Sequence, residues 1–329
     1  MDGVIPSKYK ILEAVVIMKN VIFVLENEKR GSFLSIVEET KKINRFIQEL
    51  RQGGLNVVKV AVSPRFVNAC DAPLFDEQQC NTQNTLLIID HGQIAKHYAK
   101  KGYAVIGYER QHQGPYYDVG ISSHQVEKDK ANDFWGIEHL LQGFDEVDDV
   151  YLKRIFERCH NIPWKICETK RCIIREITVE DVDRLYEIYA EPSITEYMED
   201  LFENPKEEKE YTMQYIKNIY HMYGYGMWII EEKQTGQIIG RAGLEQNEGM
   251  EGLELGYVIA VPYQRKGYAY EVCSAILDYA WENLETEVIT SAIEKGNVAS
   301  EKLCRKLGFI NVCEFVKNGV TYYKYKREK

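Results

Sequence analysis

A short polar segment, Gln264-Arg265-Lys266-Gly267-Tyr268-Ala269, joins an apolar run to a stretch of helical character. The apolar run ends at Pro262, and the first N–H groups of the following helix have no partners within the helix. The helix dipole adds positive potential there, and the absence of a Cβ at Gly267 lets an anion approach the backbone. We therefore predict an anion site, with a diphosphate as its natural occupant. The alternative is an ordinary strand–loop–helix turn that binds nothing.

The elements around this segment predict an α+β second half of the chain. Strand-like runs occur at residues 172–178, 226–232, 237–245, 252–261 and 288–293, followed by two closing strands. Helices are expected at about 179–189, 269–283 and 299–307. This order predicts an antiparallel meander with one strand–loop–helix crossing in its middle.

The first half alternates strand-like and helix-like segments. The strands are expected at 21–25, 55–62, 85–90 and 103–108, and the helices at 33–52, 92–102 and 145–160. This alternation predicts βαβ units and a parallel sheet, that is, an α/β domain. A linker is expected at 161–172, which gives domains 1–165 and 166–329. Residues 1–17 are expected to precede the first strand as an extension.

Composition excludes several classes of function. The 329 residues carry a formal net charge of -10, which argues against nucleic acid as the main partner. The most apolar early run, 11–25, is interrupted by Glu13 and Lys19, so neither a membrane span nor a signal peptide is expected. The eight cysteines form no CxxC pair, so we expect reduced thiols, no bound metal and a cytoplasmic protein.

Three ordered motifs resemble the GNAT superfamily of N-acetyltransferases. Gln264-x-x-Gly267-x-Ala269, directly after LGYVIAVP, resembles its acyl-CoA-binding motif, and NVASEKLCRKLGF (297–309) resembles its second signature. The opening RCIIREITVEDVDRLYEIY is similar to the first strand and helix of that fold. The resemblance covers about residues 171–326, and is closest to the branch that acetylates ribosomal-protein N-termini and various small amines.

The resemblance implies that acetyl-CoA is the acyl donor and that no metal takes part. It places the thioester in a splayed gap between two neighbouring parallel strands, beside backbone groups of Ile259, Ala260 and Val261. The diphosphate would lie on the amides of residues 265–269, and Asn297 would bind the amide region of the coenzyme.

The resemblance also implies catalytic roles. A primary amine arrives protonated, so a base must take its proton. Glu254 is the first candidate and Glu245 the second; either could instead be a solvated strand residue. Many family members place a tyrosine where this chain has Cys304, so the identity of the group that donates to the leaving thiolate is left open. Ser300 could help by hydrogen bonding, and Cys304 could simply pack in the core.

The variable segment at 195–228 is acidic and aromatic, and the resemblance makes it the acceptor pocket. Charge and cation–π contact would suit a cationic amine. Tyr197, Tyr225 and Trp228 are the candidate acceptor contacts. A surface helix with a solvated charged face and a buried tyrosine stripe is the alternative.

The first half weakly resembles haloacid-dehalogenase-like phosphohydrolases, which follow an apolar strand with Asp-x-Asp-Gly. Here these positions are Val24, Glu26 and Asn27, so the nucleophile would be missing. Asp90 and His91 lie at the C-terminal end of a strand, which is where ligands bind in such sheets. The alternative is that the two side chains are a satisfied pair at the end of the strand and bind no ligand.

These patterns favour an N-acetyltransferase that acts by direct attack in a ternary complex, on a small cationic amine or a peptide N-terminus. Neither nucleic acid nor a membrane is an expected partner. Whether the chain forms a homo-oligomer is left open. A non-catalytic acyl-CoA sensor, with the first domain as its output, is the alternative that Cys304 favours. A bifunctional enzyme with a live hydrolase is a third reading, which Val24 argues against.

Overall fold

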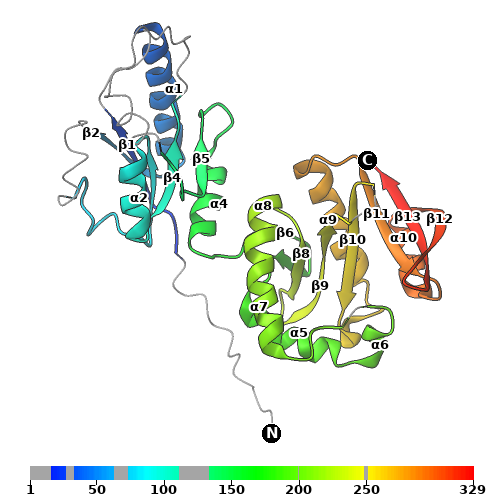
Figure 1. Ribbon diagram of the computed structural model, residues 1–329. Coiled ribbons are helices and arrows are strands. Elements are labelled where there is room, and N and C mark those ends of the chain that lie inside the picture. The colour runs from blue at the N-terminus through cyan, green and yellow to red at the C-terminus, as the bar shows by residue number, and fades with distance from the viewer. Residues whose placement is uncertain (1–15, 27–32, 63–72, 111–132, 199, 248–250) are drawn as a thin grey trace. The chain divides into compact units, whose positions relative to one another are not determined.

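The computed structural model of the chain describes residues 16–26, 33–62, 73–110, 133–198, 200–247 and 251–329. The chain divides into two compact units, residues 1–162 and 163–329, each with a sheet of its own (Figure 1).

The first unit is built on a five-stranded parallel sheet in the order β2-β1-β3-β4-β5. Its elements are β1 (Asn20–Glu26), α1 (Phe33–Gln52), β2 (Asn56–Val62), β3 (Thr85–Ile89), α2 (Gly92–Lys100), β4 (Ala104–Tyr108), β5 (His139–Leu141) and α4 (Asp149–Cys159). One apolar cluster contains Phe23 and Phe46, and another contains Ile22 and Tyr98. Since Phe23 and Ile22 alternate along β1, the clusters lie on opposite faces of the sheet. Both faces are buried, which explains why every residue of β3 is buried.

The parallel sheet predicted for the first half is confirmed. The finer resemblance to phosphohydrolases stays a prediction. Val24 is a buried strand residue that offers no nucleophile, and Asn27 lies outside the described residues. Asp90 follows β3, and its carboxylate pairs with Arg110 at 2.6 Å, with the side chain of Asp90 only 3% exposed. That geometry fits a satisfied ion pair at the end of the strand.

The second unit is built on an eight-stranded sheet in the order β12-β13-β11-β10-β9-β8-β7-β6. Its strands are β6 (Lys165–Glu168), β7 (Cys172–Arg175), β8 (Met227–Glu232), β9 (Ile238–Glu245), β10 (Leu253–Ile259), β11 (Val288–Glu294), β12 (Ile310–Lys317) and β13 (Val320–Glu328). Its helices are η2 (Val179–Asp181), α5 (Val182–Tyr189), α6 (Pro192–Thr195), α7 (Pro205–Tyr215), η3 (Ile216–Tyr220), α8 (His221–Tyr223), η4 (Val261–Tyr263), α9 (Tyr268–Asn283) and α10 (Val298–Lys306).

The predicted meander and its crossing between β10 and β11 are confirmed, but a second crossover was not predicted: α10 leads from β11 to the edge strand β12, and β13 lies between these two strands. Every neighbouring pair of strands in this sheet is antiparallel except β10 and β11, which are parallel and are joined through α9. The linker predicted at 161–172 is wrong in part, because residues 165–168 form β6, which pairs with β7 at the edge of the sheet. That strand is short and carries charged residues at both ends, so its pattern resembled a linker.

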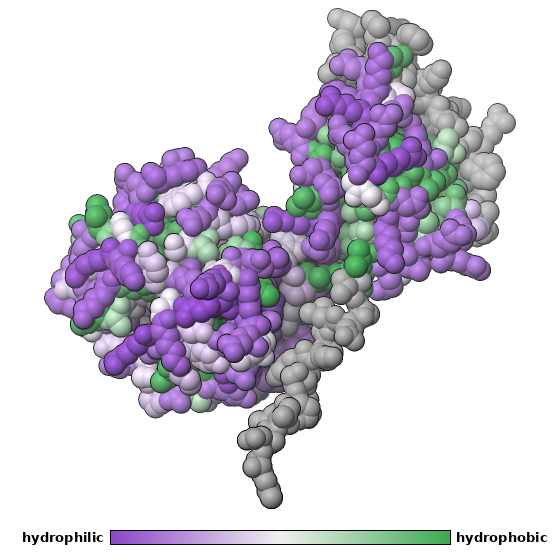
Figure 2. Space-filling model, turned by 180° about the vertical axis from the view of Figure 1, so that it is seen from behind, coloured by the Kyte–Doolittle hydropathy of each residue, from purple (hydrophilic) through white to green (hydrophobic). Residues whose placement is uncertain are grey.

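The surface is mainly polar. Figure 2 shows mostly hydrophilic residues on the face that it presents. No helix within the described part of the chain has the length and apolar character that crossing a membrane requires.

Candidate functional site

The segment Gln264–Ala269, hereafter the amide loop, is a turn that leads into α9. Gln264 to Gly267 are exposed, and both Arg265 (φ 59°) and Gly267 (φ 82°) have the left-handed backbone conformation. The amides of residues 265–270 meet no hydrogen-bond acceptor among the described residues. The loop therefore presents a row of N–H donors at the positive end of a 16-residue helix. This arrangement can receive a diphosphate, as the sequence predicts.

Arg171, immediately before β7, braces the amide loop. Its Nη1 donates to the Lys266 carbonyl oxygen at 3.0 Å, and its guanidinium carbon lies 3.9 Å from the centre of the Tyr268 ring. Its backbone amide and Nε donate to the Glu271 carboxylate at 2.9 and 2.7 Å. Burial opposes ionisation of Glu271, but hydrogen bonds from Thr169 and Arg171 outweigh it and hold the pKa of this carboxyl below its usual value.

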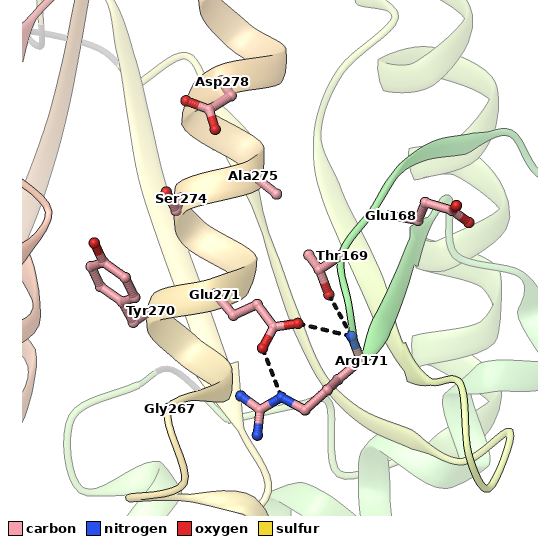
Figure 3. Close-up of a pocket in the computed structure, with 9 residues that line it drawn as sticks. All are labelled: Glu168, Thr169, Arg171, Gly267, Tyr270, Glu271, Ser274, Ala275 and Asp278. Carbon is pink, nitrogen blue, oxygen red and sulfur yellow. Dashed lines mark hydrogen bonds and ion pairs between the residues drawn. The ribbon is translucent and has the colours of Figure 1, made fainter.

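Figure 3 shows this brace at the edge of a shallow hollow of about 500 Å³, between α9 and the turn that joins β6 to β7. The α9 side chains in it include Tyr270, Ser274 and Asp278. Gly267 is the predicted site residue at its rim. None of the residues that line the hollow belongs to β10 or β11, so the hollow is separate from the gap between these two strands.

β10 and β11 part soon after they begin to pair. Residues 253–254 pair with 289–290, although β10 continues to residue 259 and β11 to residue 294. Beyond the paired residues, the Ser291 hydroxyl donates to the Leu255 carbonyl oxygen at 3.1 Å. The two strands thus form the splayed gap that the sequence resemblance implied.

The hydrogen bonds between β9 and β10 identify which backbone groups of β10 face this gap. The Ala260 amide donates to the Ile239 carbonyl oxygen at 2.8 Å, on the side of β9. Amide directions alternate along a strand, so the Ile259 amide points to the gap. The Ile259 carbonyl oxygen accepts a hydrogen bond from Gln264 Nε2 at 2.9 Å. Our assignment of the Ala260 amide is corrected, because that group already has a partner; Val261 lies beyond the strand, in η4.

Glu254 and Glu245, the two candidate bases, are directly opposite each other on β10 and β9. Their side chains therefore share one face of the sheet. The Glu254 carboxylate reaches across the gap and accepts hydrogen bonds from the Ala292 amide at 3.1 Å and from Asn247 Nδ2 at 2.8 Å. The Glu245 carboxylate accepts a hydrogen bond from the Tyr215 hydroxyl at 2.9 Å. Glu254 is thus the carboxylate that spans the gap.

The second signature forms α10 beside the gap. Asn297 is its N-cap, and its Oδ1 accepts a hydrogen bond from the Ser300 amide at 3.1 Å. Cys304 has no exposed surface, and burial raises the pKa of its thiol to about 11, which a hydrogen bond with Ser291 only partly offsets. The thiol therefore stays protonated and packed within the unit.

The three candidate acceptor contacts have different surroundings. The Tyr197 hydroxyl lies near Gly296, in the turn before α10, and Tyr225 is half-buried beside Tyr223. Trp228 has no exposed surface and packs edge-on against Tyr279 in the core. We correct the assignment of Trp228 to a core residue, because its entire side chain is enclosed within the apolar core of the second unit.

Sequence reasoning missed several residues of the site. Arg171 was noted only as the first residue of the opening motif, and its pairing with Glu271 joins positions 100 residues apart. Tyr215 was one of many tyrosines, and only its bond to Glu245 distinguishes it. Tyr257 is part of the quoted motif strand, but its direction could not be read from the pattern. The described residues contain no cluster of His, Cys, Asp and Glu that could hold a metal ion.

Comparison with known proteins points to one family. The family model described as an acetyltransferase (GNAT) domain matches residues 171–310. The uncharacterized N-acetyltransferase YoaA of Bacillus subtilis (strain 168) is 30% identical over 148 residues, which is 44% of this chain and 82% of YoaA. The uncharacterized protein YkkB of the same organism is 35% identical over 88 residues, so the alignment spans 26% of this chain and about half, 51%, of YkkB.

Among solved structures, the spermidine N-acetyltransferase from Vibrio cholerae in complex with CoA and spermine is 21% identical. The match covers 48% of this chain and 95% of that chain, with a TM-score of 0.42. The extent and identity of the YoaA match, together with the family model, assign the second unit. The chain belongs to the GNAT acetyltransferase family, and its N-acetyltransferase domain lies in the second unit.

Proposed function

We propose that the protein transfers the acetyl group of acetyl-CoA to a cationic amine, by direct attack of the amine in a ternary complex. One observation carries the proposal: β10 and β11 part beside the amide loop, and Glu254 reaches across the opening. A diphosphate on the amide loop would direct the acyl arm of the coenzyme along β10 into this gap. The acetyl carbon would then lie close to a carboxylate.

The chain's own groups suit each part of the reaction. The amine, with a pKa near 10 in water, must lose a proton before it attacks, and Glu254 can accept that proton directly or through water. The Ile259 amide is aimed into the gap, where a fixed N–H dipole would stabilise the charge that develops on the acetyl oxygen.

Charge supports a cationic acceptor. The segment from α6 to α7 carries exposed carboxylates at Asp200, Glu203, Glu207 and Glu210. Glu208 is 5% exposed and accepts a hydrogen bond from the Phe202 amide, so it holds the segment together and is not available to an acceptor. The exposed carboxylates would attract an ammonium group toward this side of the domain.

A second candidate is a non-catalytic acyl-CoA sensor. The observation that favours it is the burial of Cys304 where a tyrosine donor would be expected, because a packed thiol is a weak hydrogen-bond donor. According to this alternative, the amide loop and the gap bind the coenzyme, and the first unit responds to that binding and passes the signal on. We also propose that the domain boundary lies near residue 165, close to the division of the chain into compact units at 162–163, and that the first domain has a phosphohydrolase-like ancestry.

Release of free CoA thiol separates the two candidates. The full chain is incubated with acetyl-CoA and a panel of polyamines, aminoglycosides, amino acids and peptide N-termini. The proposal expects thiol release that depends on at least one amine, together with the acetylated amine by mass spectrometry. Tight binding of acetyl-CoA with no turnover of any acceptor would favour the sensor.

A further inference from the structure

Tyr257 occupies a special position on the strand that borders the gap. It is the third residue after Glu254, the last residue of β10 that pairs with β11. Glu254 shares its face of the sheet with Glu245 and Tyr215 of α7. Side chains alternate along a strand, so Tyr257 points to the opposite face. There its phenol lies near Cys273 of α9 and Cys304 and Ser300 of α10.

The hydroxyl of Tyr257 is buried without a satisfactory partner. Its oxygen has almost no exposed surface and meets no group at hydrogen-bonding distance and angle among the residues that the structure describes. Burial raises the pKa of the phenol far above its usual value, and a weak interaction with the Ser300 side chain, which does not meet hydrogen-bond geometry, offsets only part of that rise. Leaving a buried hydroxyl unpaired is costly, and phenylalanine would fill the same space without that cost. The hydroxyl is therefore placed for a group that arrives with a ligand.

The sulfur of the coenzyme is the group that fits. If the amide loop takes the diphosphate, the acyl arm follows β10 from residue 259 toward residue 255, next to residues 253–254, which pair with β11. Tyr257 lies midway along that path, on the face of α10, and Glu254 lies on the opposite face. Glu254, the base, would then approach the acetyl group from one face of the sheet and Tyr257, the donor, from the other. This placement suits a reaction in which the amine attacks one side of the acetyl carbon while the sulfur leaves from the other.

We propose that Tyr257 is a catalytic residue whose hydroxyl donates a hydrogen bond to the coenzyme sulfur during acetyl transfer. This inference rests on the proposed function. Tyr257 supplies from the strand the donor that Cys304 does not supply from the helix. A phenol is also a stronger donor than a thiol.

The reaction balances as follows. The amine nitrogen bonds to the acetyl carbon, the carbon–sulfur bond breaks, and its electron pair stays on sulfur. The protonated amine loses two protons in all, the first to Glu254; the sulfur takes up one from solvent, and one is released. Tyr257 keeps its own proton, because its pKa is raised, and stabilises the thiolate only through the hydrogen bond.

The test uses the full chain with Tyr257→Phe, and Tyr323→Phe on β13, whose ring lies beside Lys295, as the matched control. Three quantities are measured: the Kd for acetyl-CoA, kcat, and the pKa of the thiol of bound CoA from thiolate ultraviolet absorbance. For Tyr257→Phe we expect a Kd within about twofold of wild type, a kcat lower by roughly 10- to 100-fold and a bound-thiol pKa higher by about one unit. Tyr323→Phe should change kcat by less than about threefold and the thiol pKa by less than about half a unit.

An unchanged thiol pKa in Tyr257→Phe would overturn the inference even if kcat fell, because a purely structural role would lower kcat alone. The thiol titration needs no acceptor. A wild-type protein that binds CoA but acetylates no amine would therefore refute the proposed function, while the titration would still decide the role of Tyr257. Failure of the wild-type protein to bind CoA would overturn both.

Discussion

Gly267 combines two properties that the amide loop requires. Its φ of 82° lies in a region that side chains rarely adopt. A Cβ built there would come within 3.7 Å of Arg171 Nη2 and otherwise meet open space. Substitution is therefore limited by backbone conformation and by charge at the mouth of the loop, and steric overlap contributes little.

Gly267→Glu should weaken CoA binding without unfolding the domain. The new carboxylate would lie against the diphosphate, and repulsion of about 1.4–2.7 kcal/mol corresponds to a Kd roughly 10- to 100-fold higher. Calorimetric titration with CoA measures the change. Gly267→Asn is the control, because asparagine tolerates positive φ and adds no charge. Equal affinities of Gly267→Glu and wild type would remove the amide loop from the coenzyme site.

The two opposed carboxylates make a second residue-level prediction. Glu254→Gln preserves the acceptor for the Ala292 amide but cannot take a proton, so kcat should fall by about 10²- to 10⁴-fold. Glu245→Gln, whose partner is the Tyr215 hydroxyl, should lower kcat less than about tenfold. Steady-state kinetics with one amine compare the two variants.

A pH series sharpens this comparison. The defect of Glu254→Gln should narrow as pH rises toward the amine's own pKa near 10, since more acceptor is then already deprotonated. A larger loss in Glu245→Gln than in Glu254→Gln would reverse the assignment of the base.

At the scale of elements, the site depends on how α9 is attached to the sheet. Arg171 ties the start of β7 both to the amide loop and to Glu271 in the first turn of α9. Tyr268 adds a hydrogen bond from its hydroxyl to Glu232 at the end of β8. The start of the helix is thereby fixed against two strands that are distant from it in sequence. This attachment, and not helix propensity, determines where the row of amides points.

Removing the brace should destabilise the second unit and weaken CoA binding together. Glu271→Gln should cost about 1–2 kcal/mol, since the charged partner of two hydrogen bonds is lost in a partly buried site. Urea unfolding of full-length wild type and variant measures the loss for the transition of the second unit. Glu314→Gln is the control, because the Lys295–Glu314 pair is about half exposed at both side chains, 52% and 49%.

The effect of Glu271 should depend on pH. Its folded-state pKa is lowered, so its contribution is complete above the carboxyl's ordinary pKa of about 4.3 and is lost as pH falls through the lower folded-state value. The difference between wild type and Glu271→Gln should therefore be constant near neutral pH and shrink in acid. A difference that grows on acidification would contradict the assigned direction.

At the scale of the whole molecule, the chain has two units with separate sheets and cores. The coenzyme groups that we propose all come from the second unit. A transferase needs no response from the first unit, whereas a sensor requires one. The two proposed functions therefore differ in what the first unit does when CoA binds.

Hydrogen exchange of the full chain with saturating CoA tests this difference. We expect added protection at the amide loop and along β10 and α10, because ligand binding suppresses local opening. The sheet of the first unit should exchange at the same rate with and without CoA. Protection or exposure that spreads to β3 and β4 would support coupling between the units and hence the sensor.

Much of the fold could be predicted from local patterns, because strands and helices leave periodic traces in sequence. The helix at 33–52 was predicted with its observed bounds, since it combines a regular apolar repeat with a terminal Gly53-Gly54. β6 was missed, because a four-residue edge strand leaves too little pattern. Trp228 was misplaced, because aromatic residues suit both a core and a binding surface, and sequence does not distinguish the two.

The sequence by itself determined the order of the longer elements, the strand–loop–helix crossing and the loop rich in free amides, since each depends on neighbours in the chain. Only the tertiary structure decided that Glu254 spans the gap, that Ala260 is already paired and that Tyr257 faces α10. These facts depend on which groups from distant strands and helices meet, and such contacts are set by packing across the sheet and leave no local periodicity to read.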